Sequence, residues 1–377
     1  MRRSYTDFEG RTPSAGARPR ALAPALKLQR AIGNKAVGQV LARAPARPRQ
    51  TGLRRDDAIA RYCRKAVIFW LNNPDAELHH FATFLGAAAN TELNSLGIPD
   101  VKLHVKNVGA GGAAAIFDHE SWSMFVNPDT FTHRPDEVHS LGDLTADEAA
   151  IIAMTVYHEA RHGEQHFRIA RLLAARGEDT GLRVEEKAAA AAHADPLWAK
   201  RADPLELREA REWYSVEYGD DATYREAVTD WQGKIREMAR AARDVKADET
   251  ANLRERIGTL LKGWSKYGGA AEYVRSHLAS AKKRGATTIV KNISRINAAY
   301  DAVEREYKGL GVKPSPADFK PLAEALRELY RAVNKAYEEA PVEYDAYRTG
   351  DSVFYAFHKA LKTEQGRRNK AAAAAPH

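Results

Sequence analysis

The stretch Thr145–Arg176, TADEAAIIAMTVYHEARHGEQHFRIARLLAAR, carries the strongest structural signal in this sequence. It contains no proline, and apolar residues recur along it at helical spacing. Thr145 and Glu148 have the spacing of a capping box, and Asp147 and Glu148 suit the positive end of a helix dipole. The stretch therefore predicts one long helix that begins after Thr145 and ends near Gly177.

The middle of this helix contains the motif His158-Glu159-Ala160-Arg161-His162, HExxH. Two histidines four residues apart lie on one helical face, so both imidazoles can reach a single metal ion. The glutamate between them does not bind that metal and can take a proton from water that the metal activates. The motif predicts His158 and His162 as metal ligands and Glu159 as a general base. The alternative is an exposed helical face on which these side chains are only solvated.

Helices and short strands are expected before the motif. Helices are predicted over Asp56–Asn72 and Asp75–Asn90. Short segments rich in β-branched and aromatic residues then predict a small antiparallel sheet, formed by Val101–Val108, Ala113–His119 and Ser121–Asn127.

Almost all of the chain after the motif is predicted to be helical. Apolar residues keep a spacing of three to four over Ala222–Tyr267, which predicts one long amphipathic helix. The other predicted helices are Glu185–Ala194, Pro204–Tyr218, Ala270–Arg284, Thr287–Tyr307, Pro316–Ala340 and Val342–Leu361. The expected fold class is therefore α+β and predominantly helical.

The positive charge of the chain is concentrated at its amino terminus. The net charge is +8, from 58 lysines and arginines against 50 acidic residues. Residues 1–55 alone have a net charge of +11, and the remainder has a net charge of −3. Since the remainder leans acidic, we expect no specific nucleic-acid partner. The Arg, Pro, Ala and Gly of residues 1–55 predict a flexible basic leader, with one short amphipathic helix at 26–43.

Composition excludes several classes of protein. A single cysteine, Cys63, excludes a disulfide framework and a cysteine-rich zinc site. No apolar run approaches the roughly 18 residues of a membrane span, so we expect no membrane insertion. The basic start has no hydrophobic stretch behind it, so a secretory signal of the usual kind is not expected.

From the sheet near Val101 to the end of the helix near Arg176, the chain resembles the zincin metallopeptidases. The resemblance rests on HEARH and its place in a helix that follows a small sheet. It implies a zincin-like core, with zinc as the cofactor and cleavage of a peptide bond in a protein or peptide substrate. It assigns His158 and His162 to the zinc and Glu159 to the base. It also implies that Ser121–Asn127 is the edge strand against which the substrate pairs.

The motif does not identify the third protein ligand that a catalytic zinc usually has. The metzincin pattern needs a glycine and a histidine where this chain has Gln165 and Arg168, so that subfamily is excluded. His166 lies about 12 Å along the axis of an unbroken helix from His158, too far to share one metal. We expect His166 to pack against neighbouring side chains or to contact a metal ligand without binding the metal itself.

A glutamate from a later helix remains, as in the gluzincins. Glu343 is preferred, because the start of its helix at Pro341 resembles the Glu-x-x-Ala helix that closes the site in several small bacterial zincins. Asp345 would then contact one of the metal ligands and orient it, without binding the metal itself. The other candidates for the ligand are Glu185, Glu186, Glu209, Glu212 and Glu217. The candidates for a donor to the oxyanion, with none preferred, are Tyr214, Tyr218, Tyr344 and Tyr347.

With Glu343 as the ligand, a domain organisation follows. It comprises a leader at 1–55, a zincin-like catalytic core at 56–220, a helical insertion at 221–310, C-terminal helices that close the site at 311–365, and a tail at 366–377.

The leader supports a second resemblance. Its segment LQRAIGNKAVGQVLAR resembles a short segment of proteins associated with extracellular contractile injection systems, which are phage-tail-like bacterial particles that carry toxic cargo. The matching residues are Leu28, Gln29, Arg30, Gly33, Asn34, Ala36, Val37 and Leu41. The resemblance implies a toxin or effector made in the bacterial cytoplasm. It would be loaded into the particle through the leader and delivered to a target cell without a signal peptide.

A hypothesis outside the enzymes also stays open: the chain could be a non-catalytic helical binding or structural cargo protein with a relict zinc site. The large helical region supports this hypothesis. A structure in which no third ligand lies near His158 and His162 would favour it. A weaker alternative is nucleic-acid binding through the leader, which salt would abolish.

Overall fold

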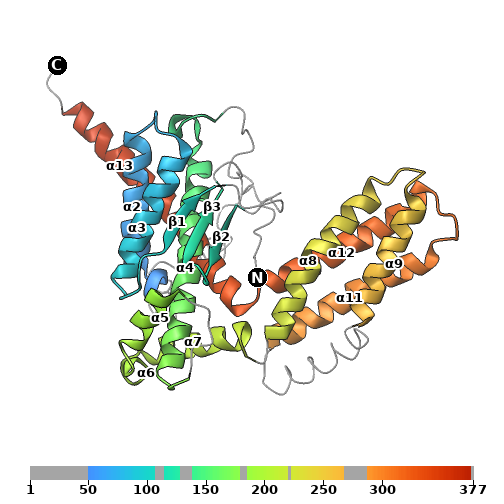
Figure 1. The fold of residues 1–377 in the computed structure, drawn as a ribbon. Helices are drawn as coiled ribbons and strands as arrows, with labels where there is room; N and C mark the ends of the chain where they lie inside the picture. The colour runs from blue at the N-terminus through green and yellow to red at the C-terminus, as the bar shows by residue number, and fades with distance from the viewer. Residues whose placement is uncertain are drawn as a thin grey trace, which may run out of the picture. The chain divides into compact units, whose positions relative to one another are not determined.

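The computed structural model describes residues 50–106, 114–127, 138–178, 185–219, 222–266 and 287–374. They form mostly helices and one three-stranded sheet (Figure 1). No helix among them is long and apolar enough to cross a membrane. The predicted helices at 26–43 and at Ala270–Arg284 lie outside the described residues.

Two compact units divide the chain. The first comprises residues 1–118, 123–156 and 353–377, and the second comprises residues 119–122 and 157–352. The predicted domain boundaries at 220, 310 and 365 do not coincide with this division. The reason is that α4 (Ala146–Ala174) and α13 (Pro341–Ala373) each contribute one end to each unit.

The first unit contains the elements that come before the motif. They are η1 (Gly52–Arg54), α2 (Asp56–Asn72), α3 (Leu78–Asn94), β1 (Lys102–Val105), β2 (Ala115–Asp118), β3 (Ser123–Val126) and η3 (Leu141–Asp143). Helix α2 has the predicted bounds, whereas α3 begins three residues later than predicted. α3 packs so closely on β1 that a Cβ added at Gly86 would lie only 2.8 Å from Leu103 Cδ2.

The sheet corrects two predictions. Its order is β1-β3-β2, with β1 parallel to β3 and β2 antiparallel to β3, so it is mixed and not antiparallel. The strand within Ser121–Asn127, β3, is central and has a partner along both sides. Its backbone groups are therefore engaged within the sheet, and the prediction that it is the edge strand for a substrate is wrong. In the described sheet the edges are β1 and β2.

Helix α4 confirms the long helix predicted from the sequence. Its start has the predicted capping box: the Glu148 carboxylate accepts from the Thr145 amide at 2.9 Å, and the Glu148 amide donates to Thr145 Oγ1 at 3.2 Å. Most of the helix is buried, including polar side chains in the motif and in the two turns that follow it. In the first unit, Tyr62 donates a hydrogen bond of 2.9 Å to the Ala153 carbonyl oxygen of α4.

The second unit contains most of the helices that follow the motif. They are α5 (Glu186–His193), α6 (Trp198–Arg201), α7 (Pro204–Glu217), α8 (Ala222–Arg243), α9 (Thr250–Lys266), α11 (Thr287–Gly309), η4 (Pro316–Asp318) and α12 (Phe319–Glu338). The predicted single helix Ala222–Tyr267 is wrong, because the chain turns between α8 and α9. In the turn, the Lys246 amide donates to the Glu249 carboxylate. The reversal buries Ile235 and Ile257 in one core.

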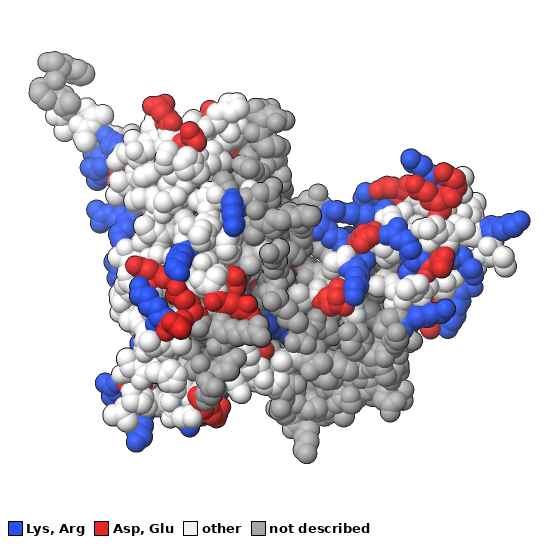
Figure 2. Space-filling view, in the orientation of Figure 1, with Lys and Arg blue, Asp and Glu red and all other residues white. Residues whose placement is uncertain are grey.

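Helices α8, α9, α11 and α12 form a bundle with its own apolar core (Figure 1). α12 packs against both α8 and α11, and Phe319, Leu326 and Val333 on its apolar face are fully buried. On the face drawn in Figure 2, basic and acidic side chains alternate over this bundle. Ion pairs within the bundle include Lys234–Asp230 and Arg256–Glu237.

Helix α13 continues further than predicted. It reaches Ala373, so the predicted tail at 366–377 is mostly helical in its described part. Alanine has the highest intrinsic helix propensity, so the run of alanines from Ala371 extends the helix. At its other end, α13 begins at Pro341 shortly after α12 ends, and Glu343 lies in its first turn.

Candidate metal centre

Two helices bring three ligand side chains together in the second unit. His158 and His162 are one turn apart on α4, and Glu343 comes from the first turn of α13. All three side chains are buried, with at most 4% of each residue exposed. Burial of a carboxylate and two imidazoles is costly unless another group satisfies their charge and lone pairs, so this grouping itself points to a bound partner.

The distances between the ligand atoms fit a metal ion. His158 Nε2 and His162 Nε2 are 3.0 Å apart, and Glu343 Oε2 lies 3.5 Å from His162 Nε2 and 3.9 Å from His158 Nε2. Ligands at about 2.0–2.1 Å in a tetrahedral zinc site are about 3.3 Å from one another. In the described part of the chain, this is the one group of three such side chains that could hold a metal ion.

His158 is kept neutral by its surroundings. Burial lowers the pKa of its imidazole from 6.5 to about 3, and the neighbouring His162 acts in the same direction. Glu343, a backbone hydrogen bond at Ala346 and Asp345 act the other way and are outweighed. Because a metal binds the unprotonated nitrogen, a neutral His158 is ready to act as a ligand at neutral pH.

The lowered pKa of His158 predicts an acid sensitivity of the metal-free protein. A histidine that titrates near 6.5 when unfolded and near 3 when folded leaves the unfolded state with more protons in between. Stability should therefore fall as the pH drops from 6.5 toward 3. Urea unfolding of zinc-free protein at pH 7 and pH 4.5 should show a smaller loss in His158→Asn than in the wild type. Equal losses would contradict this assignment.

Gln165 connects His162 to α13. Its Oε1 lies 2.9 Å from His162 Nδ1. Its Nε2 donates to the Val342 carbonyl oxygen at 2.9 Å and to Asp345 Oδ2 at 3.0 Å. One buried amide thus contacts a candidate ligand on α4 and the turn of α13 that carries Glu343. Asp345 supports the site as the sequence predicted, but it does so through Gln165.

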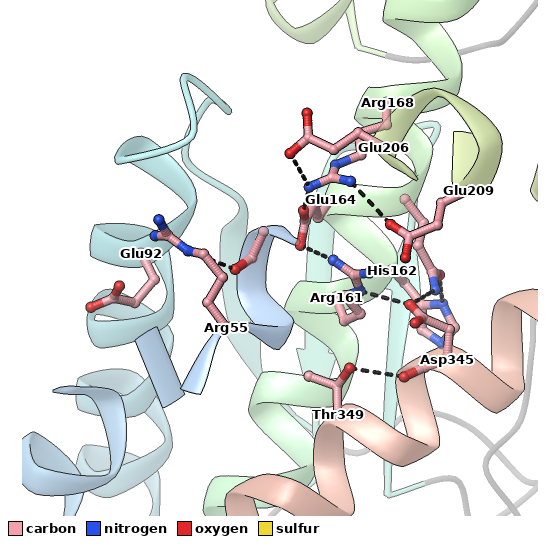
Figure 3. Close-up of polar contacts among 12 residues, drawn as sticks. Arg55, Glu92, Arg161, His162, Glu164, Arg168, Glu206, Glu209, Asp345 and Thr349 are labelled. Atoms are coloured by element: carbon pink, nitrogen blue, oxygen red, sulfur yellow. Dashed lines mark hydrogen bonds and ion pairs between the residues drawn. The ribbon is translucent and has the colours of Figure 1, made fainter. Parts of the chain in front are cut away.

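A buried ion network ties the same two helices together. Arg161 donates to Asp345 Oδ2 at 2.7 Å and also to Glu164 (Figure 3). Burial acts to lower the pKa of Arg161, but the charges of Asp345 and Glu164 raise it overall, so this guanidinium stays charged. The Arg161 guanidinium also lies 5.1 Å from the ring centre of Trp213 on α7. Three helices are therefore fixed around the motif.

The other glutamates considered as ligands lie outside this group, and two of them form ion pairs with arginines. Glu209 pairs with Arg168 and Glu217 pairs with Arg225 at 2.6 Å. Glu185 and Glu186 lie at the start of α5, and Glu212 lies on α7. Among the described residues, none of these five belongs to the group that could hold a metal. Of the six candidate glutamates, Glu343 is the one that the structure groups with His158 and His162.

His166 and the candidate tyrosines are not part of the group of three ligands. His166 stacks on His119 with ring centres 4.6 Å apart, and the Tyr218 hydroxyl lies 3.3 Å from His166 Nδ1. His166 is therefore a packing residue, as expected from its distance along the helix. Among the candidate tyrosines, Tyr347 contacts a candidate ligand: its ring and the His158 ring are T-shaped to each other, with ring centres 4.9 Å apart.

Glu159 lies on the motif turn of α4, between the two histidines, and is 3% exposed. It is not one of the three grouped ligands, which agrees with a role other than metal binding. The position matches the motif, in which the glutamate after the first histidine serves as the base.

The contacts of Gln165 and Arg161 were not predicted from the sequence. Gln165 is three residues after His162 and therefore on the same side of the helix, which was an available signal. Arg161 lies inside the motif itself, but its partner Asp345 is distant in the sequence, so nothing local indicated the pair.

Comparison of the chain with protein-family models, with curated proteins and with solved structures found no match. The zincin resemblance therefore stands on the residues quoted for it, and the zincin-like core stays a prediction.

Proposed function

We propose that this chain is a zinc-dependent endopeptidase. His158, His162 and Glu343 would hold the zinc, and Glu159 would be the general base. The observation that carries the proposal is the meeting of three buried ligand atoms within 4.8 Å of one another, two from the motif and one from a distant helix. The alternative interpretation of the motif, an exposed and solvated helical face, would leave these side chains accessible to water.

The donor set favours zinc over other common ions. Two imidazole nitrogens and one carboxylate oxygen are a frequent set in catalytic zinc sites, whereas calcium and magnesium prefer ligands that are all oxygen. Three protein ligands leave a fourth position for a reacting molecule, and a purely structural zinc site would usually fill it with a fourth side chain.

The residues divide the work of peptide hydrolysis. A bound zinc ion would polarise the scissile carbonyl and acidify the attacking water. Glu159 accepts the proton of that water and can pass it to the departing amine, which makes it base and then acid. His158 stays neutral and keeps its lone pair for binding. The Arg161–Asp345 ion pair holds α13 on α4, so that Glu343 keeps its place opposite the two histidines.

The non-catalytic alternative keeps the large helical region as its support, but the observation that would have favoured it further is not made. It would be favoured by the absence of a third ligand near His158 and His162, yet Glu343 Oε2 lies 3.5 Å from His162 Nε2.

The role as an injected effector is also part of the proposal. It rests on the leader residues that resemble those of injection-system proteins and on the basic charge of residues 1–55.

Incubation with a proteome-derived peptide library tests the proposed activity. Zinc-loaded protein should create new amino termini detectable by mass spectrometry. The chelator 1,10-phenanthroline should stop their formation, and added zinc should restore it. If a protein with one bound zinc per chain generates no new termini across the library, the non-catalytic alternative is favoured instead.

A further inference from the structure

We propose that Gln165 is a positioning residue that orients two metal ligands at once, His162 and Glu343. This inference rests on the proposed zinc site and deepens it, because it names the group that prepares the site before metal arrives. Gln165 is fully buried on α4, three residues after His162. Its three polar contacts reach one ligand on the same helix and the turn that carries the other.

The contacts of Gln165 determine which way its amide points. Nε2 lies 2.9 Å from the Val342 carbonyl oxygen and 3.0 Å from Asp345 Oδ2. A carbonyl can only accept, and an ionised carboxylate can only accept, so the group that faces them must be the NH2. The opposite orientation would set an oxygen against two oxygens. The amide oxygen therefore faces His162.

This orientation selects the tautomer of His162. An amide oxygen is an acceptor only, so His162 Nδ1, at 2.9 Å, must carry the hydrogen. In a neutral imidazole, the other nitrogen then has the free lone pair. That nitrogen, Nε2, is the atom that lies 3.0 Å from His158 Nε2 and 3.5 Å from Glu343 Oε2. Gln165 thus presents the metal-binding nitrogen of His162 to the site.

The donor side of the same amide holds the first turn of α13. Val342 directly precedes Glu343, and Asp345 is two residues beyond it, so both acceptors flank the third ligand. Asp345 Oδ2 also accepts from Arg161 at 2.7 Å, which fixes the carboxylate that Gln165 contacts. A rotation of α13 that moved Glu343 away from the histidines would break these hydrogen bonds. Groups that support metal ligands in this manner typically change metal affinity by about 10–100-fold when they are removed.

Selective nitrogen-15 labelling of histidine tests the tautomer in the wild-type protein. In zinc-free protein at pH 7.5, the His162 signal, assigned by its absence in His162→Gln, should show a protonated Nδ1 and an unprotonated Nε2. A protonated Nε2 in the zinc-free protein would overturn the proposal. This measurement needs no Gln165 variant, so it remains decisive even if such a variant fails to fold.

Gln165→Met tests the effect on metal binding, because methionine keeps the approximate size and removes all three hydrogen bonds. Competition titration with a zinc chelator should show affinity weaker by about 10–100-fold than in the wild type. With cobalt as a spectroscopic substitute, the visible absorption should be weaker or shifted. The matched control is Gln232→Met, which changes a buried glutamine of the bundle that bonds to Asn334, and its zinc affinity should equal that of the wild type.

The outcomes separate this inference from the proposed function. If the wild type binds zinc tightly and Gln165→Met binds it equally well, Gln165 has no positioning role and the proposed function stands. If the wild type itself binds no zinc at micromolar concentration, the proposed function fails and this inference fails with it.

Discussion

Replacing Glu159 by glutamine should reduce peptide cleavage by at least about 100-fold, and by as much as about 10,000-fold, while the zinc content stays unchanged. General bases contribute factors of this size, and an amide of the same shape cannot accept the proton. Glu159 is buried, lies between the two histidines in the sequence and is not one of the grouped ligands, so its loss should leave metal binding intact. The effect should fall on kcat rather than on zinc affinity.

Kinetic assays on a cleaved peptide, together with metal analysis of the same preparation, measure both parts of the Glu159→Gln result. Glu178→Gln is the matched control, because Glu178 follows α4 with a half-exposed side chain and lies outside the metal group. Its activity should equal that of the wild type. Activity retained in Glu159→Gln would remove Glu159 from the mechanism. Zinc lost together with activity would assign it a structural role instead.

Removing the carboxylate of Glu343 should abolish tight zinc binding. Glu343→Gln keeps the size of the side chain and replaces an anionic ligand by a neutral amide. Zinc sites built entirely by protein ligands are worth about 10–16 kcal/mol, so a ligand contributes several kcal/mol, or at least about 100-fold in affinity. Zinc that binds only the folded state should stabilise the wild type by about 2.7 kcal/mol when the free zinc concentration is a hundred times Kd. The wild type should therefore show a zinc-dependent rise in Tm, and Glu343→Gln should lose that rise.

Glu186→Gln is the control for the Glu343 result, since Glu186 was an open candidate for the same ligand and lies at the start of α5. It should bind zinc as the wild type does. Thermal melts with and without zinc compare the three proteins. If Glu186→Gln loses zinc and Glu343→Gln keeps it, the third ligand has been assigned to the wrong helix.

The parts of the site that lie within one helix were accessible from the sequence. His158 and His162 meet because a helical turn brings residues four apart together, whatever the rest of the chain does. The bounds of α2 and the cap of α4 followed from local rules for the same reason. Glu343 was different: its meeting with the motif depends on how α13 packs on α4, and only a resemblance of its helix start favoured it over the other glutamates.

The wrong predictions concern features that local pattern does not determine. The segment Ser121–Asn127 has the composition of a strand, but its central place depends on partners from two other segments. The apolar spacing in Ala222–Tyr267 continues across the turn between α8 and α9, because both helices bury their apolar faces in one bundle core. The spacing of apolar residues shows that both faces are buried, but it does not show where the chain reverses.

The amino-terminal charge and the metal site concern different parts of the proposal. The +11 of residues 1–55 belongs to the predicted leader, which lies almost entirely outside the described residues. The buried charges around α4 instead hold the candidate site together. Evidence for peptidase activity would therefore leave the proposed route of delivery still to be tested.

The central claim is that His158, His162 and Glu343 share one zinc ion. Anomalous X-ray diffraction at the zinc edge, on crystals of the full chain grown with zinc, tests it most directly. The claim predicts one strong peak per chain, within about 2.0–2.2 Å of His158 Nε2, His162 Nε2 and a Glu343 carboxylate oxygen. A peak bound by other side chains, or no peak between these three residues, would contradict it.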